Sequence, residues 1–336
     1  MESKSTKMWR APTLLLARRG GAEQRRVPAW RHDFLICFVA AMRRFAFLCA
    51  VTLMCTAAQA QVFQFTREQM MEYTKDNPFE RFPDGRPKVP DALLKKLENV
   101  SAEEVWTILQ RHNYNNQFSG DWRILHPEKH LVGRAVTAQF MPLREDVQSV
   151  AEAKATGSGP KRNANQRVID SLQNGDTIVV DLYGKQEGGT YVGDNLATAI
   201  NTFTHSGMVI NGALRDLDSI LSIGMPVYIR GAHPTPISNC MLTGVNVPIR
   251  IEEATVLPGD VVFGDGEGVY FIPPKFVSEI VTNADELHVH DEWTQMMLKT
   301  GKYKSSDIYP KPRDPELLKQ YEEYKKQHLA HLEAGR

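Results

Sequence analysis

Two short apolar runs flank an amphipathic stretch in the middle of the chain. Residues 177–182 (TIVVDL) and 208–210 (MVI) are mostly apolar, as is typical of buried strands. Residues 194–205 between them have a helical pattern, and Gly207 follows as a stop signal. The order strand, loop, helix, strand predicts a right-handed βαβ unit with two parallel strands. The loops that leave the two strands are then expected to open at the same carboxyl edge of the sheet.

The same patterns predict a mixed α/β fold for the rest of the chain. A proline-rich arm is expected at 75–90, and the hydrophilic residues 145–165 are interpreted as a surface loop, either a lid or an idle insertion. Ser101, with Glu104 three residues later, matches a helix capping box. Helices are expected at 63–74, 91–98, 101–111, 166–173, 217–223 and 275–298, and in a charged tail from Pro312 that packs on its own domain or on a neighbour. Strands are expected from Leu131 and at 226–230, 248–252, 260–263 and 269–272.

The first 60 residues are expected to lie outside this fold. From Met42 the chain reads as two arginines, an apolar stretch and the motif Ala58-Gln59-Ala60, the pattern of a secretory signal peptide. Cleavage after Ala60 would export the protein, with the periplasm as the expected compartment. Neither apolar half of this segment approaches the roughly 20 residues of a spanning helix. No stable membrane anchor is therefore expected after processing, although Cys55 leaves lipoprotein processing as an alternative.

Composition narrows the choice of partners. The 336 residues carry 40 basic and 40 acidic side chains, so no global field favours nucleic acid as a partner. Of the four cysteines, only Cys240 lies beyond the predicted signal peptide. An exported protein without disulfides must rely on its core or on oligomerisation for stability. Cys240 itself is interpreted as a small buried residue rather than a nucleophile.

The chemistry of the predicted βαβ unit lies in its two loops. Gly193 to Leu196 form a turn at a helix N-terminus, where unpaired N–H groups favour a carboxylate or a phosphate. Arg215 and Asp216 follow the second strand; the guanidinium is suited to a carboxylate, and the Asp216 carboxylate is suited to a hard cation such as Mg²⁺. The alternative is that Arg215 and Asp216 form only a local ion pair or a helix cap.

Several motifs, in the same order, resemble those of one family. The segment GDNLA is followed, 22 residues after its glycine, by Arg-Asp; LVGRAVTAQ, NGDTIVVD and LPGDVVFGDGEGVYFIP lie on either side. Together they resemble the RraA-like family, which includes the class II 4-hydroxy-4-methyl-2-oxoglutarate/4-carboxy-4-hydroxy-2-oxoadipate aldolases. The resemblance covers about residues 101–298. The chain departs from the family pattern around Trp106 and in a longer loop at 183–192.

The resemblance implies a fold and an assembly. The expected fold is a compact swivelling β/β/α domain with a central sheet flanked by helices, assembled as a homotrimer or a hexamer. The expected domains are an upstream extension with its signal peptide (1–60), an N-terminal helix and arm (61–100), the RraA-like catalytic domain (101–300) and a charged helical tail (301–336).

It also implies a set of site residues. The backbone of Gly193, Asp194, Asn195 and Leu196 would cradle a pyruvyl carboxylate. Arg215 would bind the same end of the substrate. Asp216 would hold Mg²⁺ or another divalent cation such as Mn²⁺, partly through water, and Asp194 would reach metal-bound water. Arg215, Asp216 and Asp194 are thus the expected catalytic residues.

The reaction implied is cleavage of a C–C bond in a 2-oxo acid to release pyruvate. Retro-aldol cleavage of 4-hydroxy-4-methyl-2-oxoglutarate and decarboxylation of oxaloacetate share an enolate that a divalent metal would stabilise. The alternative is a non-catalytic regulator that acts through protein contacts, because the name-giving branch of the family inhibits a ribonuclease. A methyltransferase is rejected, since no glycine-rich loop for S-adenosylmethionine is followed by an acidic strand end.

The general base is the least defined part of this hypothesis. His288, Asp291 and Glu292 fall at helical spacing and would share a helix face, supplied within the chain or across a subunit boundary. The alternative is an exposed helix with ordinary polar residues. His233, after a predicted strand, is expected at the same sheet edge as Arg215, where it would influence substrate choice. His205 is interpreted as a helix C-terminal residue.

Overall fold

The computed structural model describes residues 63–155 and 163–334, so the predicted signal peptide lies outside the described residues. These residues belong to one compact unit. Within them, no helix combines the length and the apolar character that crossing a membrane requires.

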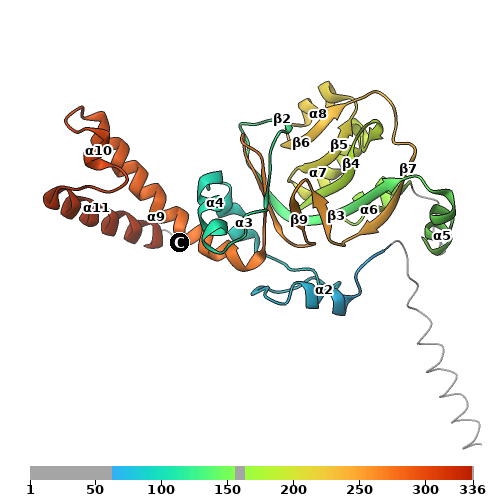
Figure 1. Cartoon of the computed structure of the whole chain (residues 1–336), viewed down its shortest axis with the longest axis horizontal. Coiled ribbons are helices and arrows are strands. Elements are labelled where there is room, and N and C mark those ends of the chain that lie inside the picture. Colours follow the sequence, from blue (N-terminus) through green and yellow to red (C-terminus); the bar gives the residue numbers. More distant parts are fainter. Residues whose placement is uncertain (1–62, 156–162, 335–336) are drawn as a thin grey trace, which may run out of the picture. The chain divides into compact units, whose positions relative to one another are not determined.

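A nine-stranded mixed sheet forms the centre of the described fold (Figure 1). Its strand order is β1-β11-β10-β3-β4-β5-β6-β2, and β7 pairs with β3 outside this path. The four parallel strands are β3 (Leu131–Pro142), β4 (Asp176–Thr190), β5 (Met208–Leu214) and β6 (Val227–Ala232). The antiparallel strands are β1 (Phe118–Ser119), β2 (Arg123–Leu125), β7 (Cys240–Val245), β10 (Val261–Gly264) and β11 (Val269–Ile272). A separate hairpin consists of β8 (Ile249–Ile251) and β9 (Ala254–Val256).

The helices largely confirm the sequence pattern. In α4, Ser101 accepts a hydrogen bond from the Glu104 amide, and Glu104 accepts one from the Ser101 amide, so the predicted capping box is confirmed. The expected loop at 145–165 is wrong in its first half, because α5 occupies Glu145–Ala155. The helices are α2 (Arg67–Tyr73), α3 (Asp91–Leu97), α4 (Ala102–Arg111), α5, α6 (Ala164–Ile169), α7 (Asp194–Thr204), α8 (Leu217–Ile223), α9 (Pro274–Lys299), α10 (Ser305–Ile308) and α11 (Pro315–Ala334).

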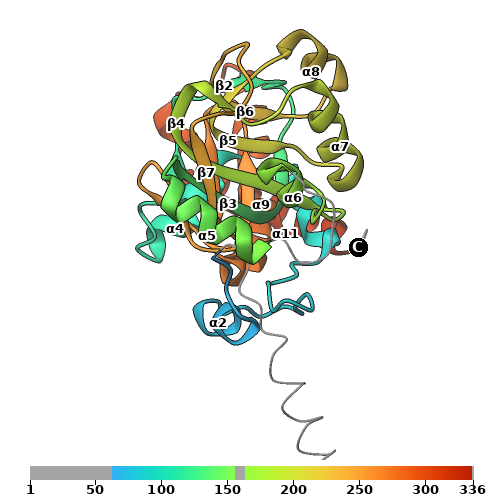
Figure 2. The ribbon, with the colours of Figure 1, turned by 90° about the vertical axis from the view of Figure 1, so that its right-hand side faces the viewer.

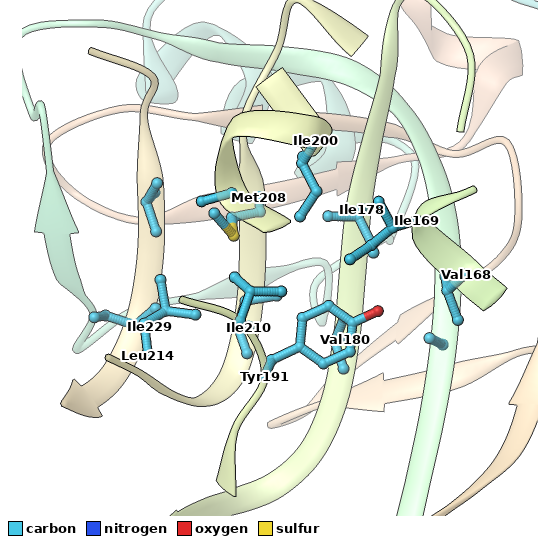
Figure 3. Close-up of a cluster of buried hydrophobic side chains, with 14 of the residues drawn as sticks. Val168, Ile169, Ile178, Val180, Tyr191, Ile200, Met208, Ile210, Leu214 and Ile229 are labelled. Atoms are coloured by element: carbon cyan, nitrogen blue, oxygen red, sulfur yellow. The ribbon is translucent and has the colours of Figure 1, made fainter. Parts of the chain in front are cut away.

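The parallel strands are buried on both faces, which explains their continuous apolar runs. Figure 3 shows Ile178, Val180, Ile210 and Ile229 packed against residues of α6 and α7 on one face. The alternate residues of the same strands belong to a second apolar cluster with the β8–β9 hairpin: Val179, Val209 and Tyr228. Burial on two faces holds the ends of β4, β5 and β6 in fixed positions, and these ends carry the candidate site.

The C-terminal helices pack onto the rest of the described chain. The long helix α9 contacts α3 and α4, and it also contacts α10 and α11. Trp293 of α9 is buried with Leu317 and Tyr321 of α11, and the Trp293 and Tyr321 rings lie 5.2 Å apart. The prediction that the charged tail uses an apolar stripe for packing is thus confirmed, and its partner is a helix of its own chain.

The proline-rich arm is anchored by a buried ion pair. Arg86 of the arm and Asp176 at the start of β4 are 2% and 0% exposed, and they form two hydrogen bonds of 2.8 and 3.1 Å. The Arg86 guanidinium also stacks on the ring of Phe82, 4.4 Å from its centre. The prolines of the arm predict little regular structure. The arm is nevertheless held in place by the contacts of Arg86, which its composition does not predict.

Candidate active site

The two loops of the predicted βαβ unit meet at the carboxyl edge of the sheet. Strands β4 and β5 are parallel, with Ile178 opposite Met208, and α7 connects them as predicted. Helices α7 and α8 lie side by side (Figure 2). The Arg215 amide donates to the Val192 carbonyl at 3.3 Å, so a backbone hydrogen bond joins the two loops directly. The predicted convergence of these loops is a feature of the fold.

Gly193 lies directly against the Arg215-Asp216 pair. A Cβ atom at Gly193 would stand 2.3 Å from Asp216 Oδ2 and 2.9 Å from Arg215 Nε. Neighbours this close favour glycine, because a side chain at this position would have to displace the ends of the Asp216 and Arg215 side chains. The two loops therefore approach each other closely at Gly193.

Asp216 occupies an N-cap position without acting as a cap. It precedes α8 in the left-handed conformation, with φ 59° and ψ 39°, and its side chain makes no capping hydrogen bond. Its Oδ2 atom instead accepts from Arg215 Nε at 3.3 Å. Aspartate at a helix N-cap ordinarily satisfies an amide of the first turn. Of the two alternatives, the structure therefore shows the ion pair with Arg215 and not the helix cap.

The ion pair leaves both side chains with free binding capacity. Arg215 and Asp216 side chains are 38% and 43% exposed, and one hydrogen bond joins them. In the described part of the chain, no other partner contacts the terminal nitrogens of Arg215. An exposed pair of this kind stabilises a fold by about 0–1 kcal/mol. Stability alone does not explain why Asp216 adopts a left-handed backbone conformation and is held with Arg215 against Gly193.

The N-terminus of α7 differs in one respect from the predicted anion cradle. The Asn195 amide donates to Oδ1 of its neighbour Asp194 at 2.7 Å, and the first helical hydrogen bond runs from the Ala197 amide to the Gly193 carbonyl at 3.0 Å. Asp194 and an incoming anion would thus compete for the Asn195 amide. Rotation of the Asp194 carboxylate away from the helix would free that amide.

His233 lies beside Arg215, as the strand order predicted. Leu214 of β5 pairs with Ala232 of β6, and the His233 amide donates to the Leu214 carbonyl at 3.0 Å. The His233 Nδ1 atom lies 2.9 Å from Thr235 Oγ1. Thr235, which sequence reasoning missed, also accepts from the Gly188 amide at 2.8 Å. The imidazole is therefore oriented by a threonine that joins two loops.

The segment expected as a long loop at 183–192 is largely an extension of β4. Strand β4 continues to Thr190 with two irregularities, and Lys185 pairs with Gly212 of β5. The segment turns at Gly184 and Gly188, both of which have positive φ angles. Residues 183–190 therefore belong to the sheet and pair with the end of β5, where a long loop was expected.

Comparison with known proteins places the chain in a family. Residues 88–271, more than half of the chain, match the sequence profile of a family described as "RraA-like: Aldolase/RraA". The chain belongs to the RraA-like family. The predicted family and the mixed α/β fold with a central sheet flanked by helices are both confirmed.

Individual RraA-like relatives are distant in sequence. A protein of Halalkalibacterium halodurans named "Putative 4-hydroxy-4-methyl-2-oxoglutarate aldolase" is 27% identical over 158 residues, which are 47% of this chain and 75% of that protein. Protein DlpA of Legionella pneumophila is 28% identical over 172 residues, 51% of this chain but 26% of that longer protein. The crystal structure of Streptomyces coelicolor RraAS2, described as an unusual member of the RNase ES inhibitor RraA protein family, superimposes with a TM-score of 0.54 at 28% identity, covering 65% of this chain and all of RraAS2.

The donor set of the RraA-like site suits a hydrated cation. Among the described residues, no group of three or more His, Cys, Asp or Glu side chains could enclose a metal ion. Asp216 and Asp194 are the carboxylates of the two converging loops, and Asp216 is close to half exposed. Mg²⁺ is commonly held by one or two carboxylates and keeps several waters or substrate oxygens as its other ligands. The two carboxylates are compatible with such an ion, which Asp216 would hold partly through water.

The three candidate base residues on α9 have other partners within the chain. His288 Nε2 lies 3.4 Å from Glu104 of α4, and the side chain of Asp291 lies 3.0 Å from His290 Nδ1. Glu292 is hydrogen-bonded to Tyr324 of α11 and raises the pKa of that phenol, in addition to the effect of burial. None of these contacts involves the loops of Gly193 or Arg215. The structure does not bring these residues to the site within one described chain.

Cys240 is not a nucleophile in this arrangement. It is partly buried at the start of β7 and packs against the apolar cluster beneath α6 and α7. Burial raises the pKa of its thiol, with a smaller opposing effect from Lys185. A thiol with a raised pKa carries little thiolate at neutral pH, so its interpretation as a small packed residue agrees with the structure.

Proposed function

We propose that this protein is a divalent-metal-dependent lyase that cleaves a C–C bond of a 2-oxo acid and releases pyruvate. The observation that supports it most is the contact of Gly193 with the Arg215-Asp216 pair. It places an uncapped helix N-terminus, a guanidinium with free donors and an exposed carboxylate within one small volume. Names of RraA-like relatives as 4-hydroxy-4-methyl-2-oxoglutarate aldolases point to the same chemistry.

The proposed roles follow from the donors of each residue. The terminal nitrogens of Arg215 and the amides at the start of α7 bind and orient the substrate carboxylate, which displaces Asp194 from the Asn195 amide. Asp216 would hold Mg²⁺, with Asp194 in reach of its water. Bound there, Mg²⁺ supplies positive charge that stabilises the enolate oxygen developing from the 2-keto group.

The reaction then needs two proton movements. In the retro-aldol direction, a base removes the proton of the 4-hydroxyl group, the bond between C3 and C4 breaks, and its electron pair moves into the enolate of pyruvate. Protonation of that enolate at carbon gives pyruvate. In oxaloacetate decarboxylation the same enolate forms with loss of CO₂, and no hydroxyl proton has to be removed. His233 is near enough to Arg215 to contact the substrate beyond its pyruvyl end and to influence which 2-oxo acid fits.

The assay is Mg²⁺-dependent release of pyruvate from 4-hydroxy-4-methyl-2-oxoglutarate and from oxaloacetate by the purified protein. We expect Asp216→Asn to lower kcat/KM by about 100-fold or more, since it removes a charge that acts on the transition state. Asp218→Asn, on the exposed first turn of the same helix α8, is the matched control and should retain activity. An inactive wild-type protein across a panel of 2-oxo acids, with no Mg²⁺ binding by calorimetry, would refute the lyase and favour a regulator that acts through protein contacts.

Assembly and location are also proposals. A homotrimer or hexamer is proposed because the family resemblance implies it, and because the candidate base residues of α9 do not reach the loops of Gly193 and Arg215 within one described chain. Light scattering of the purified protein tests it. Export with cleavage near Ala60 is tested by N-terminal sequencing of protein from a periplasmic extract, where an N-terminus at Met1 or Met42 would contradict it.

A further inference from the structure

His233 is held at the sheet edge that carries the candidate active site. Strand β6 ends at Ala232, which pairs with Leu214 of β5, and the His233 amide donates to the Leu214 carbonyl. Arg215 follows Leu214 in the chain, so the half-buried His233 is a direct neighbour of the proposed carboxylate-binding residue. The state of its ring therefore bears on what the site can bind.

Thr235 fixes one nitrogen of the His233 ring. The Thr235 amide donates to His233 Nδ1 at 3.4 Å, and Thr235 Oγ1 lies 2.9 Å from the same nitrogen. Pro234 and Pro236 flank Thr235, and neither has an amide hydrogen that could compete for Nδ1. The fixed φ angles of the two prolines also limit the conformations of this turn. The His233 side chain is thus bound by its own turn.

The turn around Thr235 is bonded to the extension of β4. The Gly188 amide donates to Thr235 Oγ1 at 2.8 Å, and Thr190 Oγ1 donates to the Thr235 carbonyl. The Ser238 amide donates to the Gly188 carbonyl at 2.8 Å. Gly188 has a φ angle of 63°, in the region that favours glycine. These hydrogen bonds hold the turn, and with it the His233 ring, against another strand.

The same contacts assign the proton of a neutral His233 ring to Nε2. An amide hydrogen faces Nδ1, and an amide nitrogen only donates, so Nδ1 accepts with its lone pair. Thr235 Oγ1 accepts from the Gly188 amide, and its hydroxyl hydrogen is available to donate to Nδ1. A neutral imidazole whose Nδ1 accepts carries its proton on Nε2. His233 is therefore a hydrogen-bond donor at Nε2.

The Nε2 atom of His233 is accessible and has no partner within the described residues. The ring is half-buried, and the described polar atoms that are both buried and unsatisfied do not include Nε2. The hydrogen bonds of the ring all run to Nδ1. The two nitrogens of an imidazole point in different directions, so the N–H bond at Nε2 is directed away from Thr235. A free donor of this kind suits an acceptor oxygen, and a carboxylate forms the stronger hydrogen bond.

We propose that His233 is a specificity-determining residue of the proposed lyase. Its Nε2–H donates to a carboxylate oxygen at the end of the substrate opposite the pyruvyl group, while Arg215 binds the pyruvyl carboxylate. The site then favours 2-oxo acids with a second carboxylate over those that end in a methyl group. Thr235 is the positioning residue that keeps the donor on Nε2, and His233 does not remove the 4-hydroxyl proton. This inference rests on the proposed function, which places a 2-oxo acid at Arg215.

Calorimetric titration of the full chain with Mg²⁺ present tests the donor role without turnover. The matched probes are 2-oxoglutarate, which has a second carboxylate, and 2-oxopentanoate, which ends in a methyl group. Neither has the 4-hydroxyl group that retro-aldol cleavage requires. We expect the wild type to bind 2-oxoglutarate about tenfold more tightly, because it gains one hydrogen bond to a charged group.

Two substitutions of His233 separate the donor from the bulk of the ring. His233→Leu should reduce the binding ratio to about one, whereas His233→Gln, whose amide N–H can replace Nε2–H, should retain most of it. Thermal melting verifies that both variants are folded. A ratio that is unchanged in folded His233→Leu would overturn the inference, and so would a wild type that binds neither acid.

Long-range ¹H–¹⁵N spectra measure the tautomer directly. The ring signals that are absent from His233→Leu belong to His233, and at mildly alkaline pH, where histidine is ordinarily neutral, they should show a protonated Nε2. Thr235→Val removes the hydroxyl group but keeps the amide, so part of the ring should shift to the form protonated on Nδ1, with a smaller binding ratio. Thr235→Ser should behave as the wild type. A wild-type ring protonated mainly on Nδ1 would overturn the assignment.

Failure of this inference and failure of the lyase give different results. Pyruvate release by the wild type, with equal binding ratios in wild type and His233→Leu, would refute the role of His233 and leave the lyase in place. A binding ratio that His233→Leu abolishes, without pyruvate release from any 2-oxo acid, would support the donor role and refute the lyase.

Discussion

Gly193 and Asp216 are in such close contact that a single methyl group added to Gly193 would collide with the Asp216 carboxylate. A Cβ atom at Gly193 would stand 2.3 Å from Asp216 Oδ2. This contact, rather than the Arg-Asp sequence by itself, gives the site its geometry. It brings the start of α7 and the carboxylate before α8 to a separation that one substrate carboxylate and one hydrated cation can span.

Gly193→Ala is expected to abolish most of the activity while the protein remains folded. The new methyl group must displace the Asp216 carboxylate or the Arg215 side chain, and a displacement of about 1 Å at such a site can reduce activity about 100-fold. The measurement is kcat/KM for pyruvate release, together with a melting curve. Gly266→Ala, whose added Cβ would meet no atom closer than 4.0 Å, is the control. Activity within threefold of wild type would show that this contact does not define the site.

Asp216 and Ser101 should differ in their effect on stability, although both precede a helix. The Ser101 side chain caps α4, whereas the Asp216 side chain makes no capping hydrogen bond. Ser101→Ala is therefore expected to lower the free energy of unfolding by about 1 kcal/mol. Asp216→Asn keeps a residue that tolerates the left-handed conformation, so we expect a change of less than about 0.5 kcal/mol. Urea denaturation measures both, and a larger loss in Asp216→Asn than in Ser101→Ala would mean that Asp216 is mainly structural.

Asp260 should make the protein less stable as the pH rises from about 4 to about 7. Burial raises the pKa of this carboxyl from 3.8 to about 7, against the opposing hydrogen bond from the Leu257 amide. The folded protein thus holds this proton more tightly than the unfolded chain does. Its contribution to stability is complete below the unfolded pKa, declines as the pH rises toward the folded pKa, and is level above it. The loss is on the order of 2–4 kcal/mol.

Asp260→Asn is the direct test of that pH dependence. Asparagine can still accept from the Leu257 amide through Oδ1, but it has no proton to lose. Urea denaturation of both proteins at about pH 5 and about pH 8 should show a smaller difference for the variant than for the wild type. Equal pH dependence in the two proteins would show that Asp260 titrates near its ordinary value.

The sequence predicted those features that depend on periodicity and turn chemistry. The βαβ unit appears with its helix at Asp194–Thr204, one residue shorter than predicted, and Arg215 lies beside His233 as parallel strand order requires. The secondary structure of two segments was not predicted by these patterns. The polar character of residues 145–155 favours a loop, yet they form α5, because glutamate, alanine and lysine are strong helix formers. The extension of β4 was not predicted because its glycines are typical of a loop, although glycine also permits bends inside a strand.

Side-chain partners across long sequence separations could not be predicted. Arg86 in a proline-rich arm looks like a solvated residue until its partner Asp176, 90 positions later, is known. The orientation of the Asp216 carboxylate toward Arg215 rather than toward its helix is likewise a matter of tertiary contact. The same reason limits the assignment of the general base, because the spacing of His288, Asp291 and Glu292 does not reveal which surface they face.

If a residue of α9 supplies the base, it must come from a second copy of the chain. Glu292 bonds to Tyr324 of α11, and α9 packs against α3, α4, α10 and α11 rather than against the loops of the site. We therefore expect Glu292→Gln to lower kcat with little change in KM, and a mixture of two inactive variants to regain activity. In mixed oligomers of Asp216→Asn and Glu292→Gln chains, one interface in four pairs an intact Asp216 with an intact Glu292. Activity should thus reach about a quarter of the wild-type value. Oligomers that mix fully but stay inactive would exclude a shared site, and full activity of Glu292→Gln alone would exclude Glu292 as the base.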